Sequence, residues 1–186
     1  MLIRLLDIVF ALSGLVLGFP VLILLTIIGL FDTGSPIFRQ QRVGRNKRPF
    51  TLVKFRTMKP DTAHVASHLA SSSAITPFGG FLRKTKLDEL PQLWNVLRGD
   101  MSLVGPRPER PFFVEQFKQR VPQYMLRHKV KSGMTGWAQV NGWRGDTSIE
   151  KRIEYDLYYI ENWSVVLDFK ILWLTVLRGF FHRHAY

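Results

Sequence analysis

Two adjacent carboxylates, Asp88 and Glu89, lie in the segment TKLDELPQLW of a chain that is otherwise strongly basic. Acidic side chains are common at the start of a helix, where free backbone N–H groups stabilise negative charge. Pro91 supports this interpretation, because proline is tolerated only in the first turn of a helix. The sequence therefore predicts a helix that begins at about these residues, and an ordinary helix start would by itself explain the two acids.

The same arrangement would also serve phosphate chemistry. We expect a carboxylate at a helix N-terminus to stay ionised, and free amides nearby can receive a phosphate group. An ionised aspartate can attack phosphorus and form an acyl phosphate, as in aspartyl-phosphate enzymes. An adjacent glutamate can hold Mg²⁺, which takes one or two carboxylates together with oxygens of a phosphorylated substrate. Asp88 is thus a candidate nucleophile and Glu89 a candidate metal ligand, while the structural explanation stays open.

Candidate phosphate-binding groups lie on both sides of the acids. In TLVKFRTM, alternation predicts a strand with Lys54 and Arg56 on one face, where they would either converge on an anion or protect a sheet edge. In VGPRPE, Arg107 stands between two prolines, which stiffen the backbone and leave the guanidinium preorganised for a phosphate. A plain rigid turn would have the same sequence, so this alternative also stays open.

A glycine-punctuated segment, SGMTGWAQVNGWRGD, is expected to form a loop and adds weaker candidates. It contains Gln139 and Asn141 beside Trp137, whose ring could stack on a base or a sugar. His64 and His68 lie four residues apart, but no third ligand is evident nearby, so this spacing favours a polar loop over a metal site. The chain has no Walker loop and no dinucleotide fingerprint. It has no cysteine, which excludes disulfides and thiolate chemistry.

An apolar segment near the N-terminus brings these groups to a membrane. Residues 8–31 contain no charged side chain, a run longer than the roughly 20 apolar residues that cross a bilayer. Pro20, which follows Phe19, allows either a kinked spanning helix or a re-entrant hairpin whose ends return to one side. Periodicity alone favours the spanning helix. Between Asp32 and Asp61 there is no acid but there are eight basic residues, which indicates a cytoplasmic location there: Arg39, Arg42, Arg45, Lys47, Arg48, Lys54, Arg56 and Lys59.

The remaining elements read as one compact unit. Strands are expected on both sides of a turn within 33–58, and a strand is expected before the Pro-Arg-Pro turn. Segment 61–77 reads as a loop or a short helix. Helices are expected over 109–120, from about 122 and over 148–163, followed by an interrupted apolar helix that suits a membrane interface. The net charge of +12 predicts attraction to anions, whether nucleic acid, lipid or phosphorylated small molecules.

In combination, these motifs are specific enough to indicate a protein family. KFRTM, LRKTKLDELPQLWNVLRGDMSLVGPRPE, GMTGWAQVNG and YDLYYIENWSVVLDFKILWLTV follow, in this order, an apolar segment broken by proline. The chain closely resembles the bacterial sugar transferases, the monotopic phosphoglycosyl transferases, over almost its whole length. We therefore expect one catalytic domain over 1–186, similar to the small catalytic form without an additional transmembrane bundle. The resemblance implies an α+β, mainly helical fold with a re-entrant helix–break–helix over 1–34, a β-hairpin and amphipathic interfacial helices.

The resemblance implies a reaction. Such enzymes transfer a sugar-1-phosphate from a UDP-sugar to undecaprenyl phosphate and release UMP, at the cytoplasmic face of the bacterial inner membrane. This is the first membrane step in the assembly of O-antigen, capsule, exopolysaccharide or a glycoprotein glycan. The family nucleophile, which forms a covalent phosphosugar intermediate, matches Asp88, and the Mg²⁺ ligand matches Glu89. Phosphate-binding groups match Lys54 and Arg83, and Arg107 is expected near the nucleotide.

The resemblance also changes the expected topology. It implies a re-entrant helix with its break at Phe19–Pro20 and both ends cytoplasmic. Phe19 stands where a serine often assists the break, and Ser132 stands where many relatives have proline. Asp168 matches a further family position and joins the substrate-binding candidates with Arg56, Gln139 and Asn141.

Two alternatives compete with this interpretation. A membrane-anchored protein could use its basic surface on nucleic acid or lipid without catalysis, but it would leave Asp88 and Glu89 unexplained, and we expect no nucleic-acid partner. A related enzyme could transfer the group directly in a ternary complex, without a covalent intermediate. Gly14 and Gly18 have a spacing found at helix-packing faces, which permits a homodimer in the membrane without requiring one.

Overall fold

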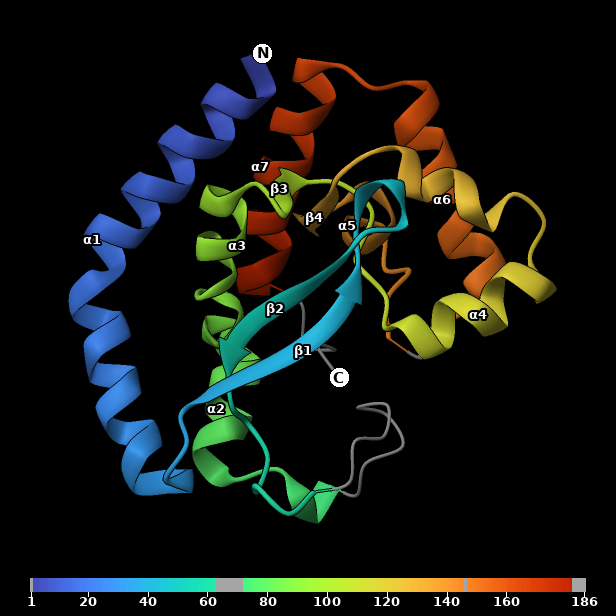
Figure 1. Cartoon of the computed structure of the whole chain (residues 1–186). Coiled ribbons are helices and arrows are strands. Elements are labelled where there is room, and N and C mark those ends of the chain that lie inside the picture. Colours follow the sequence, from blue (N-terminus) through green and yellow to red (C-terminus); the bar gives the residue numbers. More distant parts are fainter. Residues whose placement is uncertain (1, 63–71, 146, 182–186) are drawn as a thin grey trace.

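The computed structural model describes residues 2–62, 72–145 and 147–181 (Figure 1). Its helices and strands are α1 (Leu2–Thr33), β1 (Ile37–Val43), β2 (Pro49–Phe55), α2 (Pro77–Thr85), α3 (Gln92–Arg98), β3 (Met101–Val104), α4 (Pro111–Arg120), β4 (Ser132–Thr135), α5 (Trp137–Val140), α6 (Ile149–Glu161) and α7 (Val165–Phe181). Four 3₁₀ helices join them: η1 (Arg45–Lys47), η2 (Ser72–Ala74), η3 (Leu87–Glu89) and η4 (Tyr124–Lys129). The prediction of a mainly helical α+β fold with short strands is confirmed.

α1 is a single helix of 32 residues that bows along one side of the molecule (Figure 1). We predicted two helices separated by a break at Phe19–Pro20, but helical structure continues through both residues. Pro20 lacks the N–H that would bond to the preceding turn, and its ring presses on that turn, so it favours a bend and need not end the helix. α1 is long and apolar enough to cross a membrane.

Charged side chains near its start attach α1 to the rest of the chain. The carboxylate of Asp7, which is buried, accepts hydrogen bonds of 2.9 Å from Ser102 Oγ and from Leu103 N. Arg4 donates to two carbonyl oxygens in the last turn of α3, both at 2.5 Å. Gly14 also faces α3, where an added Cβ would lie 3.0 Å from Leu93 Cδ1. One member of the glycine pair is therefore used for packing within the chain.

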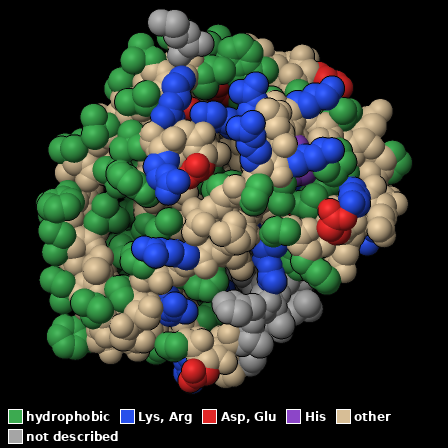
Figure 2. All heavy atoms as spheres, viewed as in Figure 1, with side chains coloured by type: hydrophobic (Ala, Val, Ile, Leu, Met, Phe, Trp, Pro, Cys, Tyr) green, Lys and Arg blue, Asp and Glu red, His purple; other side chains and the backbone are tan. Residues whose placement is uncertain are grey.

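Much of the surface of α1 and α7 is apolar. On α1 the large exposed side chains include Leu17, Phe19 and Phe31. On α7 the exposed positions recur at helical spacing: Val166, Phe169, Trp173, Val176 and Leu177. Figure 2 shows the α1 side of the molecule covered by hydrophobic side chains. Exposure of so large an apolar surface to water is unfavourable, so these helices indicate association with a membrane.

β1 and β2 form the predicted antiparallel hairpin, with Val43 opposite Pro49. The hairpin lies against α3, and the fully buried Asn95 makes the link. Its side chain accepts a hydrogen bond from Val53 N at 3.0 Å and donates one to Thr51 O at 2.8 Å. Asn95 thereby satisfies backbone groups along the edge of β2. It sets the position of the hairpin relative to the acidic segment that precedes α3.

A second sheet pairs β3 with β4 in parallel. We predicted β3, but β4 and α5 lie in a segment that we expected to be a loop. The glycines of that segment permit the pairing, because a Cβ at Gly133 would lie 2.1 Å from Gly105 N and one at Gly136 would lie 2.2 Å from Gly105 O. Glycine marks close backbone approach as well as loops, and the sequence alone did not distinguish the two.

Most of the remaining helices agree with the sequence. The helices predicted over 109–120 and 148–163 are confirmed as α4 and α6, and the C-terminal helix as α7. The chain after Pro122 forms the 3₁₀ helix η4 and no longer helix. Segment 61–77 is described only in part, with η2 and the start of α2 as its helical pieces. His64 and His68 lie outside the described residues.

Candidate active site

Asp88 lies in η3, between α2 and α3, and is 8% exposed. No described residue donates a hydrogen bond to its carboxylate. Burial, and then the charge of Glu89, raise its pKa to about 6, against the opposing charges of Lys54, Arg107 and Arg83. We predicted that this carboxylate stays ionised; burial disfavours its charge more than the neighbouring cations favour it. At neutral pH the group is still mostly ionised.

The helix that we predicted to begin at Asp88 is two short pieces. η3 comes first, and α3 begins at Gln92 with Pro91 as its N-cap. The amides of Glu89 and Leu90 already bond to carbonyl oxygens three residues earlier, at 3.2 Å. We expected free amides near the acids, and these two amides are not free. Proline marks the start of α3, and the acids belong to the turn before it.

Glu89 faces Arg107 across the site. Both terminal nitrogens of the Arg107 guanidinium donate to the Glu89 carboxylate, one at 3.4 Å and the other in a shorter contact. Burial opposes ionisation of Glu89, but Arg107, together with Lys54 and Lys86, outweighs it, so the pKa of Glu89 is lowered. Glu89 in turn raises the pKa of Arg107. Both groups therefore keep their full charge.

Lys54 and Arg83 complete the group of charges around Asp88. The Lys54 ammonium lies 5.5 Å from the centre of the Phe38 ring. Burial lowers the pKa of Lys54, while the two carboxylates raise it. Arg83 Nε donates to Thr57 Oγ1 at 2.9 Å, which anchors this side chain just beyond β2. The structure thus brings together the predicted groups Lys54, Arg83, Asp88, Glu89 and Arg107.

The Pro-Arg-Pro turn is held from outside, because its carbonyl oxygens accept hydrogen bonds from other elements. Gly133 N donates to Pro106 O (3.0 Å), Arg127 Nη2 to Arg107 O (2.8 Å), Arg42 Nη1 to Pro108 O (3.0 Å) and Val43 N to Glu109 O (2.9 Å). The donors come from β4, η4 and β1. The prediction of a rigid Arg107 turn is supported by contacts as well as by its prolines.

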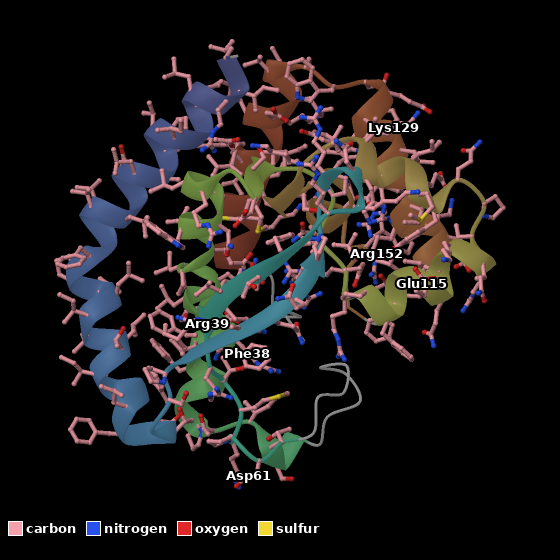
Figure 3. The ribbon with its side chains drawn as sticks, viewed as in Figure 1. Phe38, Arg39, Asp61, Glu115, Lys129 and Arg152 are labelled. Carbon is pink, nitrogen blue, oxygen red and sulfur yellow. The ribbon has the colours of Figure 1, made fainter. Side chains whose placement is uncertain are left out.

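Figure 2 shows Lys and Arg side chains gathered on the face that carries the hairpin, beside the hydrophobic side formed by α1. Phe38 and Arg39 lie on the hairpin in Figure 3. A site of this kind combines a buried carboxylate, a second carboxylate that is fully ionised, and several fixed cations. It suits a phosphorylated ligand at the boundary between a basic surface and an apolar one.

Comparison with known proteins decides the family. The sequence profile described as "Bacterial sugar transferase" matches residues 1–182. The chain belongs to the bacterial sugar transferase family.

Curated relatives support this assignment. The chain is 49% identical to the UDP-glucose:undecaprenyl-phosphate glucose-1-phosphate transferase of Escherichia coli (strain K12), over 97% of this chain and 40% of that protein. It is 40% identical to the UDP-N-acetylgalactosamine-undecaprenyl-phosphate N-acetylgalactosaminephosphotransferase of Aeromonas hydrophila, over 94% and 43%. It is 47% identical to the uncharacterized sugar transferase EpsL of Bacillus subtilis (strain 168), over 84% and 76%. The chain therefore spans less than half the length of the first two relatives.

Arg56 lies beside the hairpin in a structural contact. Its guanidinium donates to Ser35 O at 2.7 Å and to Ser35 Oγ at 3.3 Å. It also lies 5.4 Å from the centre of the Phe38 ring, the same ring that Lys54 contacts. Arg56 thus joins the linker after α1 to the hairpin. Of the two alternatives that the sequence left open, a shared anion with Lys54 or a protected sheet edge, the shared anion stays a prediction.

Three further predicted residues lie in other hydrogen-bonded environments. Asp168 accepts hydrogen bonds from Tyr159 Oη at 2.8 Å and Trp163 Nε1 at 3.1 Å, and it lines a small cavity with Asp7 between α1 and α7. Gln139 donates to a backbone carbonyl of β4 at 3.2 Å, and Asn141 donates to one of α5 at 2.8 Å. These contacts give each residue a structural role, and its part in substrate binding stays a prediction.

Two cations near the candidate site were not singled out from the sequence. Burial and the charges of Arg144 and Arg107 lower the pKa of Lys86, against the charge of Glu89. Burial and the charge of Arg107 lower the pKa of Arg144 in the same way. Lys86 lies two residues before Asp88, so its position in the sequence could have suggested it. Arg144 comes from a distant loop, and no local signal marks it.

Proposed function

We propose that this chain transfers a sugar-1-phosphate from a UDP-sugar to undecaprenyl phosphate and releases UMP. One observation carries the proposal: the buried Asp88 carboxylate has no hydrogen-bond donor among the described residues, while Lys54, Arg83 and Arg107 act on it electrostatically. Such an excess of fixed cations would be neutralised by the two phosphates of a UDP-sugar. Family membership and the named activities of the relatives point to the same reaction.

The proposed reaction has two displacements at one phosphorus atom. In the first, an Asp88 carboxylate oxygen attacks the phosphorus that carries the sugar, and the bond from that phosphorus to the bridging oxygen breaks. UMP leaves with the bonding electrons, and a sugar-bearing acyl phosphate stays on Asp88. In the second, an oxygen of undecaprenyl phosphate attacks the same phosphorus and the Asp88 carboxylate leaves. The carboxylate is regenerated, so the cycle needs no proton from Asp88.

The surrounding residues would position the phosphates and balance their charge. Lys54 and Arg83 would contact the phosphate that is transferred, because both act on the Asp88 carboxylate. Arg107 offers a planar fork that suits a nucleotide phosphate. Asp88 is poorly hydrated, so little water has to leave before its oxygen meets phosphorus.

Mg²⁺ is the cofactor that we propose, with Glu89 as the residue that would hold it. Mg²⁺ prefers oxygen ligands and takes one or two carboxylates together with substrate phosphates. Glu89 fits this requirement, because Arg107 lowers its pKa against the effect of burial and keeps it ionised. When bound, the ion would offset negative charge on the phosphates during transfer. Arg107 would then share or release the carboxylate that it contacts here.

We propose that α1 is re-entrant, with both ends on the cytoplasmic face of the inner membrane. Contacts between the two ends of α1 and the rest of the chain support this topology. Near its start, Asp7 bonds to Ser102 and Leu103 of β3. Near its end, Asp32 accepts a hydrogen bond of 2.7 Å from Thr76 Oγ1 at the start of α2. A straight helix of 32 residues would be about 48 Å long and would place these ends on opposite sides of a bilayer.

A topology experiment addresses α1 separately from the chemistry. A tag fused before residue 1 should be accessible only from the cytoplasmic side of the membrane. Labelling of that tag from the periplasmic side would restore the spanning helix.

The activity test is UMP release from a panel of UDP-sugars in the presence of detergent-solubilised undecaprenyl phosphate and Mg²⁺. At least one UDP-sugar should support lipid-dependent UMP release. Absence of release with every sugar, together with nucleic-acid binding that weakens steeply with salt, would favour the binding protein without catalysis.

A further inference from the structure

A second group of buried charges lies behind the Pro-Arg-Pro turn. Arg127 of η4 and Asp156 of α6 form an ion pair of 2.7 Å, and their side chains are 2% and 3% exposed. The same Arg127 nitrogen, Nη2, donates to the carbonyl oxygen of Arg107 at 2.8 Å. Arg127 Nη1 donates to Tyr124 Oη at 3.3 Å. Asp156 is therefore connected through one guanidinium to the backbone of a proposed phosphate-binding residue.

Burial of this ion pair carries a large desolvation free energy. Removing two charges from water offsets most of their attraction, and apolar residues of similar size often stabilise a fold equally well. Among the described residues, Arg127 Nε also lacks a hydrogen-bond partner. An apolar cluster that includes Val114, Tyr124 and Ile153 already packs this region. The buried charges therefore point to a role beyond packing.

The carbonyl oxygen of Arg107 is the atom that the buried pair holds in place through Arg127. Pro108 follows Arg107 and has no N–H, so the peptide between them can be fixed only through its carbonyl oxygen. Arg127 holds this oxygen, while Glu89 holds the side chain of the same residue. Without Arg127, rotation of this peptide would change ψ of Arg107 and move its guanidinium relative to Glu89.

α6 holds the same turn at a second point. Arg152 lies one helical turn before Asp156, and its Nη1 donates to Glu109 Oε1 at 2.9 Å. Figure 3 shows Arg152 between the hairpin and α4. Two charged side chains on one face of α6 thus reach the turn, one to the Glu109 side chain and one through Arg127 to the Arg107 carbonyl.

We propose that Arg127, held by Asp156, is a positioning residue that directs the Arg107 guanidinium toward the nucleotide phosphate. This inference rests on the proposed function, in which Arg107 contacts that phosphate. Arg127 itself touches no substrate. Its effect should appear in both UDP binding and turnover, and it should depend on the presence of the Arg107 side chain.

A double-mutant cycle tests the dependence. Arg127→Met should weaken UDP binding and lower kcat/KM for UMP release by about 10- to 100-fold, since small misplacements of a binding group have effects of this size. In an Arg107→Met background, the same substitution should change both quantities by less than about twofold. Equal losses in the two backgrounds, or no loss in a folded Arg127→Met protein, would overturn the proposal.

The control is Ile153→Ala, which creates a cavity in the same core and leaves the charges in place. It should lower the thermal midpoint while UDP affinity and kcat/KM stay within about twofold of their starting values. If Arg127→Met does not fold, Asp156→Asn provides the second variant, and its effects must likewise shrink in the Arg107→Met background. UDP binding keeps the outcomes distinct: a wild-type protein that binds UDP without releasing UMP contradicts the proposed function, whereas additive UDP-binding losses contradict the positioning role.

Discussion

Two groups of buried charge lie on either side of Arg107, and they differ in how their aspartates are paired. Behind the turn, Asp156 pairs with Arg127 at 2.7 Å, while Arg152 and Arg42 share Glu109 at 2.9 and 3.9 Å, so both carboxylates are in direct ion pairs. In front of the turn, the Asp88 carboxylate has no hydrogen bond from a described residue, although several cations act on it. The group behind the turn can hold the backbone of the turn in place.

The group in front of the turn, around Asp88, differs from the group behind it. Burial raises the pKa of Asp88 to about 6, so the fold keeps this carboxylate in a place that disfavours its charge. Burial also raises the pKa of Asp156, but there the charge of Arg127 opposes the shift in a direct ion pair of 2.7 Å. Strained electrostatics of this kind are more common at functional sites than in supporting structure. Asp156, which pairs directly with Arg127, is therefore suited to support, whereas Asp88, which no described residue hydrogen-bonds, is available for chemistry.

The largest expected effect is the loss of activity when the Asp88 carboxylate is removed. Asp88→Asn should lower UMP release by at least about 10³-fold, because an amide oxygen does not replace a carboxylate nucleophile. Glu115→Gln is the matched control, since Glu115 is an exposed acid on α4 that pairs with Lys118. It should leave the rate within about twofold. Similar losses in the two variants would mean that Asp88 has no special role.

The next effect is a pH dependence. Below about pH 6 Asp88 takes up a proton and loses its nucleophilic oxygen, so the second-order rate constant for the burst of UMP release should fall by about tenfold for each further pH unit. The measurement should follow the first half-reaction, in the absence of undecaprenyl phosphate, because the lipid phosphate titrates in the same range. A flat profile between pH 5 and 7 would contradict a buried carboxylate nucleophile.

Stability should change in opposite directions in the two groups. The folded pKa of Asp88 lies above its ordinary value, so as pH rises through about 4 to 6 the unfolded chain loses the proton first and the fold loses stability. Asp88→Asn avoids this loss and should stabilise the protein by up to about 3 kcal/mol at pH 7.5, with the gain vanishing near pH 4. Denaturant unfolding at both pH values measures it.

Asp156→Asn should do the reverse at pH 7.5. It leaves the Arg127 charge buried without its partner, which typically destabilises a fold by about 3–5 kcal/mol. The comparison between the groups fails if Asp88→Asn is destabilising or if Asp156→Asn is neutral.

The smallest effect concerns Arg56. Because its guanidinium bonds to Ser35 and lies outside the group around Asp88, Arg56→Gln should lower kcat/KM by less than about threefold. Lys54→Met, which removes the other cation beside Phe38, should lower it by at least about tenfold. Equal effects would restore the sequence-based expectation that the two side chains share one anion.

The parts of the site that the sequence predicted are local ones. Asp88, Glu89 and Pro91 are close in the chain, and the two prolines around Arg107 restrict it wherever the turn lies. The hairpin and α6 likewise have a clear period or turn signal. Such features depend on a few neighbouring residues, so a sequence contains enough information to predict them.

The parts that were missed depend on distant contacts. β4 was expected to be loop, because its glycines are explained only by the backbone of Gly105. The link from Asn95 to β2 and the pair of Arg127 with Asp156 join residues that are far apart in the chain. The raised pKa of Asp88 has the same origin, since burial is a property of the whole fold.

Covalent labelling tests the central claim most directly. The protein should be incubated with a UDP-sugar labelled in its sugar and Mg²⁺, without a lipid acceptor, and the labelled peptide should be identified by mass spectrometry. The account predicts a phosphosugar on Asp88, no label in Asp88→Asn, and transfer of the label to undecaprenyl phosphate when the lipid is added. Label that persists in Asp88→Asn, or lipid product formed without any labelled protein, would contradict it.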